Sequence, residues 1–245
     1  MSLPVFWMDG HRLCAGDRLE LDGAEGHHAA VVRRIRAGEL IELTDGQGHL
    51  ARCVVVDVGK QGLACVVQAR SDVAPPAPRV SVVQALPKGD RGELAVELMT
   101  EVGVDAIVPW SASRCVTQWK GERGAKALRR WRSTAREAAK QSRRSWFPDV
   151  GELATTAAAI ERVEAATLAL VLHEGVERGL SDLTPPLDGD IVLVVGPEGG
   201  ITDDEIAQFS AAGGLAVRLG PTVLRTSTAG AVAAGVLLSR TARWR

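Results

Sequence analysis

The chain has 245 residues, of which 46% are hydrophobic and 24% are charged, so it can bury one large core or two modest ones. Its formal net charge of −1 is too small to indicate a charged partner for the chain as a whole. The longest run of small apolar residues, at 229–238, is too short to cross a bilayer, and no signal peptide follows Met1. We therefore expect a cytoplasmic protein without a membrane partner.

The cysteines do not suggest a metal site or a disulfide framework. None of them forms a Cys-x-x-Cys pair, and no histidine lies at a metal-ligand spacing from them. We expect reduced, mostly buried thiols and no bound metal. The residues concerned are Cys14, Cys53, Cys65 and Cys115.

The first part of the chain is predicted to be a small β-barrel or sheet domain over residues 1–72. Valine-rich runs within residues 40–70 are broken by Asp-Gly, Gln-Gly and Lys-Gln-Gly, which is typical of short strands joined by tight turns. Residues 25–39 are predicted to open with a short helix. A linker at 73–78 follows, because its prolines favour an extended chain and exclude a helix.

Residues 79–245 show strands alternating with helices, which predicts an α/β domain of three layers around a parallel sheet. In the helix predicted at 91–103, Leu94, Leu98, Met99 and Val102 form the expected apolar face, and Gly103 ends it. The other predicted helices lie at 122–144, 202–213 and 226–240. Strands are predicted at 79–86, 105–110, 167–174, 191–195 and 215–220.

Three of these strands end in distinctive loops, at 170–175, 194–200 and 218–226. Ligands of open parallel sheets bind beyond the carboxyl ends of the strands, and glycines let the backbone approach them closely. The chain has neither GxxxxGK[ST] nor GxGxxG, which argues against a Walker phosphate loop and a dinucleotide site. The three loops together predict a pocket for another small molecule.

Two residues of these loops are candidates for chemistry. Glu198 lies outside the following helix, where its carboxylate can face a ligand or accept a proton. Arg225 precedes the polar start of the last helix and can stabilise an anionic substrate. By contrast, Thr202 and Glu205 have the spacing of a helix-capping box, and His173 is more simply an uncharged residue of the pocket wall.

Positive charge is concentrated between Trp119 and Arg144, where ten Lys or Arg residues meet only two Glu. Such a density favours an anionic partner, and nucleic acid fits it because phosphates attract the cations. Trp131 is predicted to pack into the core rather than to stack on bases. The predicted RNA-binding residues are Arg33, Arg34, Arg36, Lys88, Arg114, Arg129, Arg130, Arg132, Arg136, Arg143 and Arg144.

Four segments together resemble one known family. VVGPEGGITDDEI at 194–206 and VRLGPTVLRTSTA at 217–229 are its most specific motifs, and residues 85–115 and 130–150 match it as well. The resemblance is to the bacterial ribosomal RNA small subunit methyltransferase E family, part of the SPOUT superfamily of S-adenosylmethionine-dependent methyltransferases. Residues 25–39 also resemble the PUA-like RNA-binding domain of that family.

This resemblance implies a deep trefoil knot in the second domain, a homodimer, and methylation of N3 of one uridine near the decoding centre of 16S ribosomal RNA. The partner is then 16S ribosomal RNA or the small ribosomal subunit, and Arg225 and Glu198 are the catalytic candidates. The residues expected to bind S-adenosylmethionine are Leu172, His173, Glu174, Gly175, Gly196, Pro197, Glu198, Gly199, Gly200, Leu219, Gly220, Pro221, Leu224, Arg225, Thr226, Ser227 and Thr228.

One position departs from the family pattern. Ser227 stands where the family often has glutamate, so a role for that carboxylate does not carry over, although the serine can cap the last helix. Two other functions remain open: another SPOUT methyltransferase that modifies a ribose 2′-oxygen or a different base, and a non-catalytic RNA-binding assembly factor. The small residues Ala229, Ala233 and Leu237 form a stripe that suits either internal packing or dimerisation.

Overall fold

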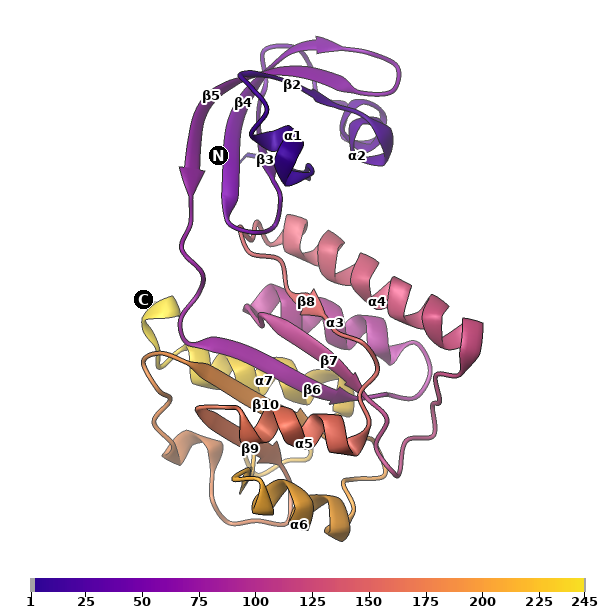
Figure 1. Ribbon diagram of the computed structural model, residues 1–245, viewed down its shortest axis with the longest axis vertical. Coiled ribbons are helices and arrows are strands. Elements are labelled where there is room, and N and C mark those ends of the chain that lie inside the picture. Colours follow the sequence, from indigo (N-terminus) through magenta and orange to yellow (C-terminus); the bar gives the residue numbers. More distant parts are fainter. Residues whose placement is uncertain (1–2, 245) are drawn as a thin grey trace. The chain divides into compact units, whose positions relative to one another are not determined.

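The computed structural model describes residues 3–244, which form two compact units. The N-terminal unit comprises the chain up to Pro75 together with Ala139–Phe147, and the C-terminal unit comprises Pro76–Ala138 and the chain from Pro148 onward. Figure 1 shows that each unit has its own sheet. Residues 139–147 therefore belong to the N-terminal unit, although the sequence-based boundaries had placed them in the second domain.

The N-terminal unit is built on a five-stranded sheet of order β1-β3-β4-β5-β2. Strand β1 pairs with β3 in parallel, and the other neighbours are antiparallel. Alternate residues such as Ile41 and Leu43 are fully buried, which is the pattern of a sheet with one face in a core. The strands are β1 (Val5–Trp7), β2 (Arg18–Leu21), β3 (Leu40–Thr44), β4 (His49–Val58) and β5 (Leu63–Asp72).

Short helices complete this unit: α1 (Gly10–Leu13), α2 (Gly23–His27) and a π-helical turn at His28–Val32. The helix expected at the start of residues 25–39 is thus present. Ala29 is fully buried, whereas Val32 is 61% exposed, so the turn has one face in the core and one in solvent.

Segment 139–147 belongs to the N-terminal unit because its backbone hydrogen-bonds to the turn between β3 and β4. The Gly48 N–H donates to the Ser145 carbonyl (2.9 Å), and the Phe147 N–H donates to the Gly46 carbonyl (2.8 Å). Gly46 has a φ of +75°, and a Cβ there would come within 2.7 Å of the Phe147 ring. Only glycine fits both the backbone conformation and the close ring contact.

The C-terminal unit contains a six-stranded sheet of order β11-β9-β10-β6-β7-β8 in which every neighbouring pair is parallel. This confirms the predicted α/β class with a parallel sheet. The predicted trefoil knot stays a prediction. The strands are β6 (Arg79–Ala85), β7 (Ala106–Trp110), β8 (Asp149–Val150), β9 (Leu168–Leu172), β10 (Asp190–Val195) and β11 (Leu215–Val217).

Helices cover both faces of this sheet (Figure 1). Along β10, Leu193 packs in the cluster formed with α3, α4 and α7, whereas Val194 packs in the cluster formed with α5 and α6. Such alternation follows from the two-residue period of a strand and makes β10 buried on both sides. The helices are α3 (Arg91–Val102), α4 (Gly121–Gln141), α5 (Thr156–Glu164), α6 (Asp203–Ala211) and α7 (Thr226–Leu238), with 3-10 turns at Leu180–Asp182 and Ala242–Trp244.

The apolar face expected for α3 is wrong in part. Leu94 is 44% exposed, and the fully buried residues of the helix include Ala95, Val96 and Met99. The buried side of α3 is the side that meets both α4 and α7: a Cβ on Gly92 would lie 2.7 Å from Nε1 of Trp131, and a Cβ on Gly230 of α7 would lie 2.9 Å from the Met99 sulfur. Gly103, with a φ of +106°, ends α3 as expected.

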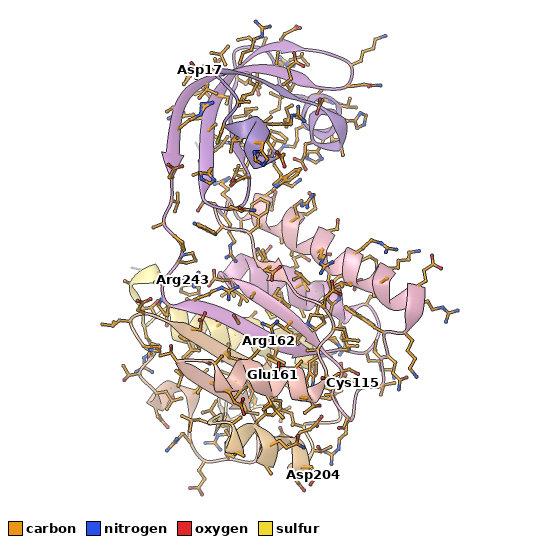
Figure 2. All side chains as sticks on the ribbon, in the orientation of Figure 1. Asp17, Cys115, Glu161, Arg162, Asp204 and Arg243 are labelled. Carbon is orange, nitrogen blue, oxygen red and sulfur yellow. The ribbon has the colours of Figure 1, made fainter. Side chains whose placement is uncertain are left out.

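The small-residue stripe of α7 is used for packing inside the unit, because Ala233 and Leu237 are fully buried in its core. The C-terminal turn is fastened to the same unit by Arg243, labelled in Figure 2. Its guanidinium donates to both carboxylate oxygens of Asp105 (2.6 and 3.0 Å) and to the carbonyls of Gly103 and Pro78.

All four cysteines are free thiols. Burial raises the pKa of Cys53 to about 11 and that of Cys65 to about 12, so both stay protonated and unreactive at neutral pH. In the described part of the chain, no cluster of three or more His, Cys, Asp or Glu side chains could hold a metal. None of the helices between residues 3 and 244 has the length and hydrophobicity needed to span a membrane.

Candidate active site

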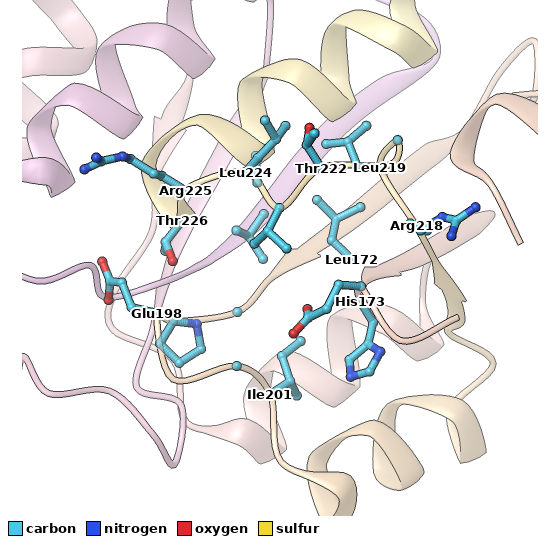
Figure 3. Close-up of a pocket in the computed structure, with 18 of the residues that line it drawn as sticks. Leu172, His173, Glu198, Ile201, Arg218, Leu219, Thr222, Leu224, Arg225 and Thr226 are labelled. Carbon is cyan, nitrogen blue, oxygen red and sulfur yellow. The ribbon is translucent and has the colours of Figure 1, made fainter. Parts of the chain in front are cut away.

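A cavity of about 590 Å³ opens at the carboxyl ends of β9, β10 and β11 (Figure 3). Its size lies within the range of ordinary small-molecule sites, roughly 300–1,000 Å³. The loops predicted from the sequence to form a pocket are thus brought together. The lining residues are Leu172, His173, Glu174, Val195, Gly196, Pro197, Glu198, Gly200, Ile201, Arg218, Leu219, Gly220, Pro221, Thr222, Val223, Leu224, Arg225, Thr226 and Ala229.

The loop between β10 and α6 turns sharply around its glycines. Gly200 adopts a φ of +75°, and its N–H donates to the Pro197 carbonyl at 2.9 Å. At Gly196, a Cβ would lie 2.6 Å from Cγ1 of Ile201, which is itself buried and lines the cavity. Glycine at these positions therefore lets the loop fold back on itself and expose its backbone to the cavity.

His173 shapes the loop that follows β9. Its backbone N–H donates to the Val217 carbonyl (2.9 Å), and its Nδ1 accepts a hydrogen bond from the Gly175 N–H (3.1 Å). A ring nitrogen that accepts a backbone N–H carries no proton, so the neutral ring holds its proton on Nε2. These contacts agree with the simpler interpretation of His173 as a residue of the pocket wall.

The loop between β11 and α7 is held at both ends. The Arg218 N–H donates to the Arg178 carbonyl (2.8 Å), and the buried amide of Gln84 on β6 donates to the Thr226 carbonyl (3.2 Å). The expectation that Ser227 caps α7 is wrong: the N-cap residue is Arg225, no side chain caps the helix, and Ser227 is only 2% exposed. Ser227 lies inside the first turn of α7, where its side chain is buried.

Glu198 and Arg225 lie on the same side of the cavity, next to Thr226 and opposite Arg218 (Figure 3). One carboxylate oxygen of Glu198 accepts the backbone N–H of Lys88 at 3.1 Å. Arg225 is exposed and forms no ion pair with any residue between 3 and 244. A carboxylate and an unpaired guanidinium at one rim can accept a proton and stabilise negative charge, respectively.

The residues that line the cavity and the residues predicted from the sequence to bind the cofactor are not identical. Gly175, Gly199, Ser227 and Thr228 do not line the cavity, and Thr228 uses its hydroxyl to donate to the Arg225 carbonyl (3.2 Å). Several lining residues were not named as cofactor contacts: four of them lie within the predicted loops, Ile201 follows the loop 194–200 directly, and Ala229 lies in the first turns of the last helix. They are Val195, Ile201, Arg218, Thr222, Val223 and Ala229.

Most of the predicted RNA-binding residues are exposed, and some of them also hold other parts of the fold. Arg132 donates to the Val150 carbonyl (3.0 Å) and pairs with Glu152 (2.8 Å), and Arg144 donates to the Trp146 carbonyl (2.8 Å). Trp131 is 2% exposed and packs edge-to-face against Trp119, which agrees with its predicted place in the core. The exposed members of the set are Arg33, Arg34, Arg36, Lys88, Arg114, Arg129, Arg130, Arg132, Arg136 and Arg143. Among these, Arg130 also pairs with Glu93 (3.0 Å), and Arg114 donates to the Gly199 carbonyl (3.1 Å).

The predicted capping box at the start of α6 is confirmed. The Thr202 hydroxyl accepts the Glu205 N–H (3.2 Å), and the Glu205 carboxylate accepts the Thr202 N–H (3.0 Å). The sequence did not reveal a second set of contacts: the same carboxylate accepts hydrogen bonds from the backbone N–H and hydroxyl of Ser113, in the loop after β7.

Comparison with known proteins identifies the family. The RNA methyltransferase domain matches residues 75–238, and the RNA methyltransferase PUA domain matches residues 21–68. A ribosomal RNA small subunit methyltransferase E from Mycobacterium tuberculosis is 53% identical over 228 residues, which cover 91% of this chain and 87% of that protein. The corresponding protein of Bacillus subtilis is 30% identical over 217 residues, or 85% of each chain.

Solved structures give the same result. The ribosomal RNA small subunit methyltransferase E of Neisseria gonorrhoeae, bound to S-adenosylmethionine, is 28% identical and superposes with a TM-score of 0.85 over 97% of this chain and 98% of that one. A Legionella pneumophila structure with bound S-adenosylmethionine is 29% identical, with a TM-score of 0.86 over 98% and 99% of the two chains. The chain therefore belongs to the ribosomal RNA small subunit methyltransferase E family.

Proposed function

We propose that the chain binds S-adenosylmethionine in the cavity and methylates N3 of one uridine near the decoding centre of 16S ribosomal RNA. The observation that carries this proposal is the placing of Glu198 and Arg225 at one side of a cavity walled by three loops. Support also comes from the relatives, since two of the solved structures hold S-adenosylmethionine.

The lining suits that molecule. Leu172, Ile201, Leu219 and Leu224 offer apolar surface for an adenine ring, and the glycine-rich loop leaves backbone groups free to read polar edges. When bound, S-adenosylmethionine supplies an electrophilic methyl group on its sulfonium sulfur. The polar side chains of the site lie mainly toward the two ends of the pocket, with Glu198 at one of them.

The chemistry of uridine assigns roles to the two rim residues. N3 carries a proton and has no free lone pair in the plane of attack, so the proton must leave before or as the new bond forms. Glu198 accepts that proton on its carboxylate, and its contact with the Lys88 N–H keeps the carboxylate directed at the rim. Arg225 stabilises the negative charge that then spreads onto the uracil oxygens.

Access to N3 requires an unpaired or flipped uridine, because base pairing hides this atom. The exposed arginines of α4 and of residues 33–36 neutralise RNA phosphates and hold the substrate. Phosphate contacts position the RNA but carry no sequence information, so the base is selected at the cavity itself.

The protein acts as a homodimer in this proposal. Leu94 on α3 and Val232 on α7 are each 44% exposed, although the two helices pack on one another, and a second subunit would cover such apolar side chains. Sedimentation at micromolar protein concentration tests this point, and a monomeric mass would contradict it.

Nucleoside mass spectrometry of 16S ribosomal RNA from a deletion strain tests the reaction. Loss of 3-methyluridine, restored by the wild-type gene, is the expected result. Loss of a ribose 2′-O-methyl or another methylated base would instead favour a different SPOUT activity. An unchanged profile, together with no binding of S-adenosylmethionine in calorimetry, would favour the non-catalytic assembly factor. Methylation assays on naked 16S RNA and on small subunits then identify the substrate form.

A further inference from the structure

Glu205 does more than cap its helix. Its side chain is 2% exposed, and its carboxylate accepts hydrogen bonds from two separate loops. On one side are the Thr202 N–H (3.0 Å) and hydroxyl (2.9 Å), and on the other are the Ser113 N–H (2.8 Å) and hydroxyl (3.0 Å). The Thr156 hydroxyl adds a further contact at 3.3 Å. A buried carboxylate with this many donors is held rigidly and in turn holds the loops that supply them.

The residue after Ser113 reaches back to the cavity loop. Arg114 donates from its guanidinium to the Gly199 carbonyl at 3.1 Å. A Cβ at Gly199 would lie 3.1 Å from the Arg114 Cβ, so the arginine stem packs along the glycine backbone as well. The cavity loop is therefore attached to the same neighbour at two points: at Gly199 through Arg114, and at Thr202 through Glu205.

We infer that Arg114 and Glu205 are positioning residues that hold the loop 196–201 in the conformation that binds S-adenosylmethionine. Neither residue lines the cavity, so both act through the loop. Between the two attachment points lie Gly200, with its positive φ, and Ile201, which lines the cavity and contacts Gly196. This inference rests on the proposed function, and it revises the role predicted for Arg114 from an RNA contact to a support of the cofactor site.

The two roles of Arg114 make different predictions for binding in the absence of RNA. If Arg114 holds the loop, Arg114→Ala weakens S-adenosylmethionine binding by about fivefold, or ~1 kcal/mol, which is typical of one hydrogen bond lost. If it contacts only RNA, that affinity stays unchanged. The measurement is isothermal titration of the RNA-free, full-length protein with S-adenosylmethionine, accompanied by a melting curve for each variant.

Two further variants sharpen the comparison. Arg114→Lys keeps a donor and the packed stem, so it recovers part of the affinity that Arg114→Ala loses. Arg129→Ala is the matched control: it removes an exposed arginine of α4 that forms no side-chain hydrogen bond or ion pair within residues 3–244, and we expect unchanged cofactor affinity with weaker RNA binding.

Glu205→Gln tests the other attachment. It replaces one carboxylate oxygen with an amide NH₂ that faces donors, so we expect at least about tenfold weaker cofactor binding. In the double variant with Arg114→Ala, the two losses should be non-additive, because both act on one loop. Should Glu205→Gln fail to fold, the Arg114 variants decide the question by themselves.

The outcomes separate cleanly. A cofactor affinity of Arg114→Ala within about twofold of wild type, whatever its melting temperature, overturns the inference. Weaker binding in Arg114→Ala with recovery in Arg114→Lys supports it. Failure of the wild-type protein itself to bind S-adenosylmethionine would contradict the proposed function rather than the holding of the loop.

Discussion

Lys88 and Glu198 are joined by a hydrogen bond of 3.1 Å from the backbone N–H of the first to a carboxylate oxygen of the second. The contact links the loop after β6 to the loop after β10, and these strands are neighbours in the sheet. Because the donor is a backbone group, the lysine side chain is free to serve another purpose. The bond fixes one oxygen of Glu198 and leaves the other for the ligand that enters the cavity.

This geometry makes Glu198→Gln an informative change. The amide oxygen can still accept the Lys88 N–H, so the loop should keep its shape while the proton acceptor is lost. We expect kcat for methylation of small subunits to fall by about 10²-fold, the usual contribution of a general base, with little change in cofactor affinity. Asp204→Asn, which changes an exposed carboxylate outside the cavity lining, is the control and should keep the wild-type rate. Full activity of Glu198→Gln across the pH range would place the base elsewhere or in the solvent.

Arg225 is expected to contribute mainly to the transition state. Arg225→Ala should lower kcat by about 10²- to 10³-fold, as loss of a group that stabilises developing negative charge does. Arg225→Lys keeps the charge but not the planar fork of donors, so it should recover only part of the rate. Single-turnover kinetics with saturating substrate measure the effect. Turnover of the alanine variant near the wild-type rate would be incompatible with this role.

The exposed face of α4 is expected to bind phosphate. Arg129→Ala should weaken RNA binding at every sequence alike and lower the slope of log K against log salt by about one. Filter binding at several salt concentrations measures both quantities. Arg132→Ala provides the contrast, because this arginine holds the Val150 carbonyl and Glu152 and should cost stability as well. An unchanged salt slope for Arg129→Ala would exclude a phosphate contact.

Glu205 should make stability depend on pH. Burial by itself raises its pKa, but hydrogen bonds from Ser113 and Thr202 outweigh burial and hold the pKa below the ordinary value of 4.5. A carboxylate with a lowered folded-state pKa stabilises the fold fully above its unfolded pKa, and this stabilisation is lost as pH falls through the folded-state value. The nearby Cys115 thiol, with a raised pKa, stays protonated throughout.

Urea unfolding of the wild type and of Glu205→Gln measures this dependence. We expect the variant to be clearly less stable at pH 7, with the difference in unfolding free energy narrowing as pH falls from 4.5 through the lowered folded-state pKa, where the wild-type carboxylate takes up its proton. If the difference in unfolding free energy between the two proteins stays constant over this range, the charge of Glu205 contributes nothing to folding.

Local features were predictable because their causes lie within a few residues. The capping box of Thr202 and Glu205, the stop at Gly103 and the alternation of strands and helices all follow from backbone preferences and short-range hydrogen bonds. The loops at the ends of β9, β10 and β11 were also found, since parallel strands place their carboxyl ends at one edge. The paired motifs then identified the family.

Contacts between distant segments were not predictable from the same patterns. Leu94 was expected in the core, yet α3 turns its Gly92 and Met99 toward α4 and α7 and leaves Leu94 exposed. Ser227 has a side chain that can cap a helix, but α7 begins at Thr226 with Arg225 as its N-cap, so Ser227 lies inside the first turn. Which side of a helix is buried depends on the helices that pack against it, and the apolar periodicity of one helix is compatible with more than one buried side.

The sequence by itself determined the α/β class, the family and the loops that wall the cavity, because turn chemistry, periodicity and motifs are written along the chain. Only the tertiary structure decided that Glu205 reaches Ser113 and that Arg114 holds Gly199, since the order of strands in the sheet brings together loops that are far apart in sequence. A hydrogen bond needs its donor and acceptor within about 3 Å, and that closeness arises only when the sheet has formed.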